Sequence, residues 1–170
     1  LAIGLLTSQT DAEKIKVQHG IARTELVHGH QMVEVPSVGD RPPRQFTRRD
    51  IAEILEPRVE EMFDLVKREI VRAGYEGMLG AGVVITGGTS LLEGMPDAAE
   101  RGLNLPARRG VPTGIGGLRD IVSNPMHATG VGLLLHARQH ADNLEAAGMR
   151  HGKGLGKVFD RMRSWMFDFF

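Results

Sequence analysis

The chain has 170 residues, which is enough for one domain, or two small ones, with a sizeable core. Its 21 basic and 21 acidic side chains cancel, so the composition indicates no general attraction to nucleic acid. The absence of cysteine excludes disulfides and thiolate metal sites, and no apolar run reaches the roughly 18 residues of a membrane-spanning helix.

The N-terminal segment is predicted to contain a strand and a short helix. Residues 1–6 form an apolar run typical of a buried strand. The chain opens inside this run without Met, which suggests a fragment. Thr10 or Asp11 is predicted to cap a helix over residues 12–19, and Gly20 to end it.

The next segment has the pattern of strands. Residues 22–27 and 32–35 are predicted strands, with a hairpin turn at 29–31 between them. A Pro-rich stretch over residues 36–43 follows. Because proline cannot donate to a sheet ladder, this third piece is confined to a sheet edge or an extended loop.

The longest predicted helix begins at Thr47, and Asp50 lies three residues on in a capping-box arrangement. Its apolar residues at helical spacing, which predict the buried stripe, are Ile51, Ile54, Leu55, Met62, Leu65, Val66 and Ile70. Pro57 is expected to kink the helix or split it in two, and Gly74 to end it.

A short apolar run followed by two glycines marks the centre of the chain. Residues 83–85 are β-branched, which is typical of a strand buried on both faces. Gly87 and Gly88 let the backbone turn sharply and a flat ligand lie against it. Thr89 or Ser90 is placed to cap the following helix. The pattern fits either an ordinary strand–turn–helix connection or one wall of a nucleotide pocket.

Four further elements are predicted after this turn. They are a helix over residues 92–103, a strand over 106–111, a Gly-rich loop over 114–117 and an apolar helix over 126–136. The polar, Gly-containing stretch over 138–154 is typical of a flexible linker.

Residues 155–170 form a separate amphipathic segment. Its apolar residues fall on one continuous helical face, and they are Leu155, Val158, Phe159, Met162, Trp165, Met166 and Phe169. Lys157 and Arg161 belong to the opposite face. This pattern is typical of a helix that lies in a membrane interface, and the alternative is a helix that packs on its own domain or on a partner.

Few residues have a spacing that indicates chemistry. Glu13 and Lys16 lie one helical turn apart, where they could hold a ribose hydroxyl and an adenine edge or simply form a surface ion pair. The histidines show no metal-ligand spacing, and neither a catalytic triad nor a G-x-x-x-x-G-K-[ST] loop occurs, so no catalytic or metal site is predicted. Five arginines near the Pro-rich stretch form either solvated charge or a site for an acidic peptide, namely Arg41, Arg44, Arg48, Arg49 and Arg58.

The order of these pieces resembles the FtsA family, the actin-like bacterial proteins that tie the FtsZ ring to the membrane at the division site. The resemblance rests on Asp-Ala-Glu-Lys-Ile-Lys-Val-Gln-His-Gly from residue 11, Val-Glu-Val-Pro-Ser-Val-Gly-Asp-Arg-Pro-Pro-Arg from residue 33, Val-Val-Ile-Thr-Gly-Gly-Thr-Ser-Leu-Leu-Glu-Gly from residue 83, and the basic amphipathic tail. It covers essentially the whole chain, as the C-terminal half of the family. The Gly-Gly turn is shared with the wider superfamily of actin, sugar kinases and heat-shock chaperones.

The resemblance implies an α/β fold, namely half of an actin-like ATPase domain. Residues 1–10 and 79–137 would form the sheet-bearing subdomain IIA, and residues 11–78 the inserted α+β subdomain IIB. Residues 138–154 would be a linker, and residues 155–170 an amphipathic membrane-targeting helix.

The resemblance also implies roles for single residues. Those that would contact the adenosine of ATP, bound with Mg, are Glu13, Lys16, Gly87, Gly88, Thr89 and Ser90. Arg58 and Glu61 match positions that dock the C-terminal peptide of FtsZ, and Arg44 matches one that tunes self-association into filaments. The other implied partners are lipids of the cytoplasmic membrane, with no nucleic acid, and the implied location is the cytoplasmic face of the inner membrane at the septum.

The resemblance has one large gap. The family's two phosphate-binding loops and its subdomains IA and IC have no counterpart here, so we expect half a nucleotide site and at most slow ATPase activity. The leading hypothesis is an ATP-binding scaffold that tethers the FtsZ ring to the membrane. The alternatives are an enzyme of the same superfamily, such as a sugar kinase or a phosphatase, and a membrane adaptor that works without nucleotide.

Overall fold

The computed structural model describes residues 1–39, 41–114, 116 and 122–146, which fall into two compact units, Leu1–Thr129 and Gly130–Phe170. The elements of the first unit are α1 (Ala2–Leu5), α2 (Gln9–His19), the 3-10 turn η1 (Thr24–Leu26), β1 (Met32–Val35), β2 (Arg44–Thr47), α3 (Arg48–Arg72), β3 (Val83–Ile85), the 3-10 turn η2 (Gly88–Leu91), α4 (Met95–Leu103), β4 (Ala107–Arg109) and the 3-10 turn η3 (Pro125–His127). Helix α6 (Ala128–Ala146) continues into the second unit.

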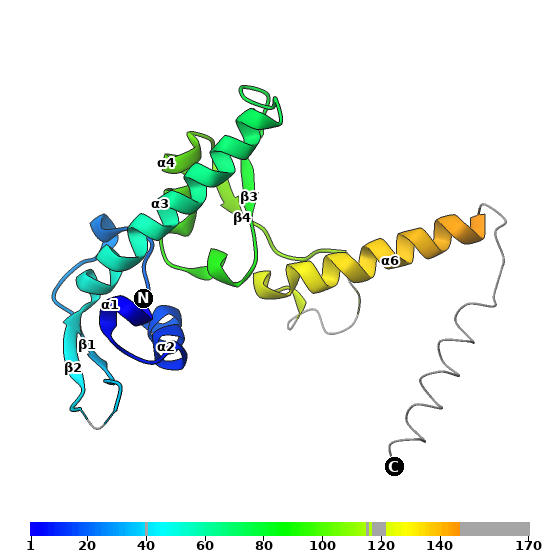
Figure 1. Ribbon diagram of the computed structural model, residues 1–170. Coiled ribbons are helices and arrows are strands. Elements are labelled where there is room, and N and C mark those ends of the chain that lie inside the picture. The colour runs from blue at the N-terminus through cyan, green and yellow to red at the C-terminus, as the bar shows by residue number, and fades with distance from the viewer. Residues whose placement is uncertain (40, 115, 117–121, 147–170) are drawn as a thin grey trace, which may run out of the picture. The chain divides into compact units, whose positions relative to one another are not determined.

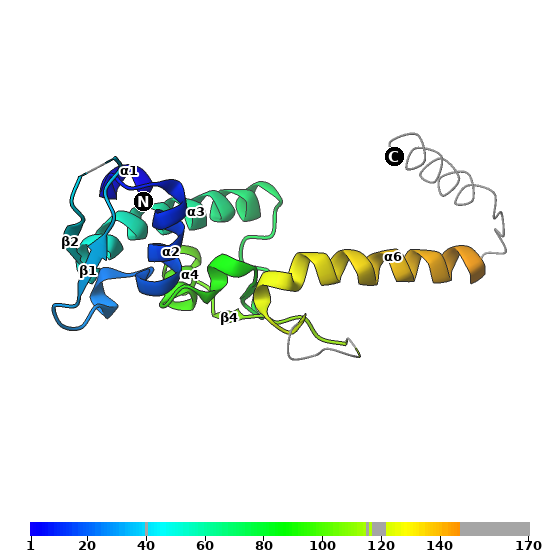
Figure 2. The same cartoon turned by 90° about the horizontal axis from the view of Figure 1, so that it is seen from below.

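Helix α3 is the element along which the rest of the first unit is arranged. The β1–β2 hairpin lies at its N-terminal end with α1 and α2 beside it, and α4, β3 and β4 lie beside its C-terminal half (Figure 1, Figure 2). The predicted capping box fixes its start, because the Thr47 hydroxyl accepts a hydrogen bond from the Asp50 N–H at 3.1 Å while the Asp50 carboxylate accepts one from the Thr47 N–H at 2.7 Å. Gly74, with a φ of 77°, follows its end as predicted.

Pro57 lies inside α3 without splitting it, so that alternative of the prediction is wrong. Proline removes one hydrogen bond of the helix ladder. Leu55 and Val59, two residues before and two residues after the proline, are buried and packed against other elements. This packing on both sides of the proline keeps α3 continuous despite the missing hydrogen bond.

Two hydrophobic clusters share α3. The first contains Leu5, Ile15, Val33, Val35, Ile51 and Leu55. The second contains Ala22, Val59, Phe63, Met95, Ala98, Ala99 and Leu103. The α3 members of the two clusters are spaced four residues apart, so one continuous face of the helix supplies both.

In the second half of the predicted stripe on α3, Ile70 is partly buried against the second cluster as predicted, but the other three residues are not buried. Met62, Leu65 and Val66 are exposed. Val59 and Phe63 are buried instead, because α4 packs against that side of the helix. Both faces are apolar in the sequence, and the position of α4 decides between them.

Residues 1–6 form a helical turn and not the predicted strand. The Leu5 N–H donates to the Leu1 carbonyl at 2.9 Å. The turn buries Leu5 completely in the first cluster, whereas Ile3 is 89% exposed and Leu6 is exposed as well. A run of this length has the same composition in a short strand and in a helical turn, so its pattern alone does not separate the two.

Helix α2 is confirmed, although it begins three residues before the predicted start. Ser8, and neither Thr10 nor Asp11, is its N-cap, and the Ser8 hydroxyl accepts a hydrogen bond from the Asp11 N–H at 3.0 Å. The Asp11 carboxylate in turn accepts hydrogen bonds from the Ser8 hydroxyl and from Lys14, which lower the pKa of Asp11 below its ordinary value of 3.8. The helix ends at Gly20, as predicted.

Residues 22–27 do not form the predicted strand, so the turn expected at 29–31 joins no hairpin there. They contain η1, which is held by α3: the Thr24 N–H and hydroxyl both donate to the Glu56 carboxylate, at 3.1 and 2.7 Å. The confirmed strand β1 pairs antiparallel with β2 instead, from Met32 opposite Thr47 to Val35 opposite Arg44.

The predicted central strand is confirmed as β3, which pairs in parallel with β4. Val83 and Ile85 pack against the second cluster. Val84, on the other face, is 53% exposed, so the prediction of a strand buried on both faces is wrong. A β-branched run is compatible with one covered face as well as with two.

The helix after the turn begins later than predicted. Helix α4 starts at Met95, and its N-cap is Gly94, with a φ of 74°. The predicted caps, Thr89 and Ser90, lie instead in the separate turn η2. The glycine allows a left-handed backbone at this position, so the chain makes two turns where the sequence indicated one continuous helix.

Helix α6 extends beyond the predicted apolar helix. It covers residues 138–146, which are helical where we predicted a flexible linker. Residues 115 and 117 of the Gly-rich loop, the rest of the linker and the whole segment 155–170 lie outside the described residues. In the described part of the chain, no helix combines the length and the apolar character needed to cross a membrane. The division into subdomains IIA and IIB stays a prediction.

Candidate functional site

The end of α2 and the segment after the glycine turn are joined through the main chain. Ile21 forms an isolated parallel bridge with Glu93. Gly20 permits this close approach, since a Cβ at that position would lie 2.3 Å from the Lys16 carbonyl oxygen and 2.7 Å from Cδ1 of Leu92. The two segments that were predicted to contact a nucleotide are therefore held side by side.

The two glycines of the turn have different structural roles. Gly87 has a φ of 89°, which side chains rarely adopt, and its N–H donates to the Pro125 carbonyl at 3.1 Å. A Cβ at Gly88 would make one ordinary van der Waals contact with a described residue, the Cβ of Met126 at 3.8 Å. Ser90 is buried, and its hydroxyl donates to the Gly87 carbonyl at 2.7 Å. Gly87 and Ser90 thus shape the turn, and Gly88 presents its bare backbone.

A cavity of about 500 Å³ lies between α2 and this turn. Glu13, Lys16, Gly88 and Thr89 line it, and these are four of the six residues predicted to contact adenosine. The other two, Gly87 and Ser90, act on the turn as described above. The volume is in the range of small-molecule and cofactor sites, roughly 300 to 1,000 Å³.

The charged side chains of the cavity form two ion pairs. Lys16 Nζ lies 2.7 Å from the Glu13 carboxylate. Arg48, from the first turn of α3, pairs with Glu93, and its Nε also donates to the His19 carbonyl at 3.0 Å. Two acids and two bases therefore balance in the lining, and each base already has an acid beside it.

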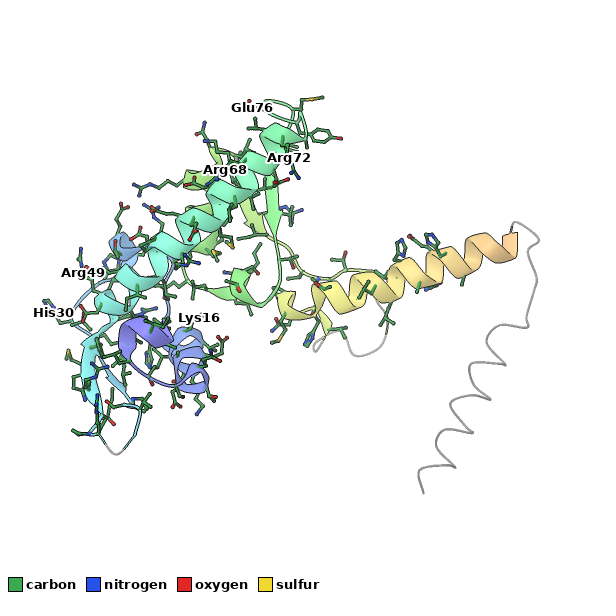
Figure 3. All side chains as sticks on the ribbon, viewed as in Figure 1. Lys16, His30, Arg49, Arg68, Arg72 and Glu76 are labelled. Atoms are coloured by element: carbon green, nitrogen blue, oxygen red, sulfur yellow. The ribbon has the colours of Figure 1, made fainter. Side chains whose placement is uncertain are left out.

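The remaining wall of the cavity is largely apolar. Val17 of α2, Leu91 and Leu92 after the turn, and Met126 of η3 contribute to it. A flat ring can pack on such a surface, while the Glu13 carboxylate can accept hydrogen bonds from hydroxyls and the Lys16 ammonium can donate them. Figure 3 shows Lys16 on α2, and Arg49 on the other side of the N-terminal part of α3.

Sequence reasoning missed eight of the twelve residues of this lining, and three of these, Arg48, Glu93 and Met126, come from parts of the chain that no prediction brought to the site. Arg48 was assigned only to a general cluster of arginines, and Glu93 and Met126 were not assigned. Arg48 and Glu93 are 45 residues apart, and no local pattern indicates that they meet. The signal that could have located Glu93 is its place five residues after Gly88 and directly after Leu92.

The residues predicted to bind partners lie elsewhere on the first unit. Arg58 and Glu61 form an ion pair on the surface of α3, with side chains 75% and 52% exposed. The Arg44 guanidinium donates to the Leu5 carbonyl and lies 5.2 Å from the centre of the Phe46 ring. Arg44 therefore has a structural contact of its own in addition to any role toward a partner.

The five arginines do not form one patch. Arg41 and Arg44 line a second cavity, of about 670 Å³, together with apolar residues of α1. Arg48 lines the first cavity, and Arg49 pairs with Glu53 at 3.3 Å on the surface of α3. The described charges are thus distributed over separate sites.

Comparison with a solved structure shows the class of fold. The crystal structure of MreB5 of Spiroplasma citri bound to ADP matches with a TM-score of 0.58, at 16% sequence identity, over 81% of this chain and 40% of that chain. The chain therefore has the fold of part of an actin-like ATPase domain, as predicted.

Sequence comparison shows the family. The model of the family described as cell division protein FtsA matches residues 1–132. The proteins of that name from Pseudomonas aeruginosa, Escherichia coli K12 and Neisseria meningitidis serogroup B are 40%, 38% and 36% identical over 98% of this chain. The chain belongs to the FtsA family of cell division proteins. It spans 41% of the length of these three relatives.

Proposed function

We propose that this chain is part of an ATP-binding, actin-like scaffold that tethers the FtsZ ring to the cytoplasmic membrane at the division septum. Membership of the FtsA family supports the role in cell division. The observation that carries the nucleotide part is the cavity in which Glu13 and Lys16 of α2 meet Gly88 and Thr89 of the turn.

The cavity fits the nucleoside end of ATP. The lack of a side chain at Gly88 lets the adenosine approach the backbone, and the apolar wall offers a surface for its ring. Glu13 and Lys16 lie where they can bond the ribose hydroxyls and the adenine edge. The charged lining residues pair with one another, so we assign the phosphates and Mg to the space outside this cavity. We propose that the bound nucleotide governs assembly into filaments rather than supporting rapid turnover.

The other partners belong to different surfaces. We assign the C-terminal peptide of FtsZ to the exposed part of α3 around Arg58 and Glu61, and self-association to the surroundings of Arg44. We assign contact with membrane lipids to residues 155–170, which lie outside the described residues. This arrangement would link filament, ring and membrane through one chain.

The substitution Gly88→Asp in the full-length protein tests the proposal. The new carboxylate enters the cavity, where it displaces the adenosine and repels the phosphates. We expect the affinity for ATP, measured by calorimetry, to fall at least tenfold, which is about 1.4 kcal/mol. The fold is retained, because a Cβ at this position meets nothing closer than 3.8 Å.

Gly80→Asp is the matched control. A Cβ at Gly80 would meet no described atom within 4 Å, and Gly80 does not line the cavity, so the affinity for ATP should stay at the wild-type value. A Gly88→Asp variant that binds ATP as tightly as the Gly80→Asp variant would remove the nucleotide from this cavity.

A further inference from the structure

Arg48 has an anchored backbone at the junction between β2 and α3. It is the first residue of α3, directly after the capping residue Thr47. Its N–H donates to the Gln31 carbonyl, next to the start of β1, at 2.8 Å. The starting point of its side chain is therefore fixed from two sides.

The Arg48 side chain adds a polar connection between two segments that also meet at the Ile21–Glu93 main-chain bridge and where Leu92 lies against Gly20. Its Nε donates to the carbonyl of His19, the last residue of α2, at 3.0 Å. Its guanidinium also pairs with Glu93, which lies between η2 and α4. The side chain is 22% exposed and lines the cavity, so it is partly removed from water while making these contacts.

We propose that Arg48 is a positioning residue for the nucleotide site, one that sets the distance between the end of α2 and the segment after the glycine turn. The inference rests on the proposed binding of ATP in this cavity. Arg48 acts through other residues: by holding the end of α2 it keeps Lys16 and Glu13 at the distance from Gly88 that a nucleoside needs.

The chemistry of arginine fits this task. A guanidinium presents five N–H donors in a rigid planar fork, so one side chain can bind a carbonyl and a carboxylate in different directions at the same time. A lysine at this position would offer one compact ammonium and could not hold both acceptors in the same geometry. Hydrogen bonds that involve a charged group are also stronger than those between neutral groups.

The contacts of Arg48 are separate from the core. Arg48 belongs to neither hydrophobic cluster, and the Ile21–Glu93 bridge does not depend on its side chain. Removing the side chain should therefore leave the first unit folded while the end of α2 gains freedom to move. Within the described residues, Arg49, the next residue, pairs with Glu53 along α3 and does not line the cavity.

The experiment compares Arg48→Ala, Arg48→Lys, Glu93→Ala and the double Ala variant in the full-length protein, with Arg49→Ala as the matched control. We expect Arg48→Ala to weaken ATP binding in calorimetry by about tenfold and Arg48→Lys to weaken it less. The double Ala variant should lose little more than Arg48→Ala alone, because the two residues act as a pair.

Amide hydrogen exchange supplies a readout that does not depend on nucleotide. In the Arg48→Ala variant without ATP, exchange should speed up at residues 17–22 while the rest of the first unit exchanges as in the wild type. Uniformly faster exchange, or the same effects in Arg49→Ala, would overturn the positioning role. If the wild type binds no ATP, the proposed function fails, and hydrogen exchange alone decides whether Arg48 holds α2.

Discussion

The lack of a side chain at Gly20 allows the end of α2 to lie close to the segment after the glycine turn. Its backbone has a φ of −65°, which any residue can adopt, so the requirement for glycine at this position is one of space. The space is missing on two sides, at the Lys16 carbonyl of its own helix and at the Leu92 side chain. The absence of a Cβ at Gly20 thus determines how close α2, with Glu13 and Lys16, lies to the other side of the cavity.

Gly20→Ala should therefore destabilise the first unit. The new Cβ would lie 2.3 Å from a backbone oxygen that cannot move without disturbing the last turn of α2. We expect the free energy of unfolding, measured with denaturant, to fall by about 1–3 kcal/mol. Gly80→Ala, where nothing lies within 4 Å of the Cβ, should change it by less than about 1 kcal/mol. Equal stability of the two variants would contradict the close approach.

The elements show which parts of the fold a sequence can predict. The start of α3 was predictable because Thr47 and Asp50 lie within one turn of each other and satisfy each other's backbone groups. The buried face of α3 was predictable only in its first half. Farther along, the choice between Phe63 and Met62 depends on α4, which comes much later in the chain.

The candidate site divides in the same way. The glycine turn and the pair of Glu13 and Lys16 are local patterns, so the sequence indicated them together with the family resemblance. Arg48 and Glu93 are 45 residues apart in the sequence, and their contact follows from the packing of the fold. A local sequence pattern does not contain this information. The prediction of a strand over residues 22–27 was wrong because of a similar long-range contact, since Glu56 of α3 binds Thr24 and holds this segment as a turn.

On the surface of α3, reversing the charge of Arg58 or Glu61 tests the assigned docking of the FtsZ peptide. Each reversal places like charges one turn apart on an exposed surface, which costs the helix only about 0.2–0.5 kcal/mol. The helix should remain folded by circular dichroism, while the affinity for the FtsZ C-terminal peptide, measured by fluorescence anisotropy, should fall.

Arg72→Glu is the control for these reversals. Arg72 forms a similar exposed pair, with Glu69, at the far end of the same helix. This variant should bind the peptide as the wild type does. Undiminished binding by both reversals at Arg58 and Glu61 would place the docking site elsewhere.

For the molecule as a whole, the assigned link to the membrane depends on residues 155–170, which lie outside the described residues. A helix of that length would be about 24 Å long at about 1.5 Å per residue, too short to cross the hydrocarbon core but long enough to lie along its surface. Asp160 and Asp168 oppose Lys157, Arg161 and Arg163, so burial of apolar side chains should supply most of the binding energy.

Replacing both Phe159 and Trp165 by Glu should release the protein from vesicles, because it places two charges on the apolar face. Arg161→Ala should have a much smaller effect, since each basic residue contributes about 1 kcal/mol at an anionic surface. Sedimentation with anionic vesicles measures both. If the double Glu variant still pellets with the vesicles, the segment is a packing helix and not a membrane anchor.

The sharing of α3 by the two hydrophobic clusters has a consequence for cooperativity. The residues that α3 gives to the first cluster and those it gives to the second stand on one uninterrupted helix. If either cluster melts, the helix loses support over half its length, and the other cluster loses the rigid surface on which it is packed. We therefore expect the two clusters to lose their structure together, so that the first unit unfolds in a single cooperative transition.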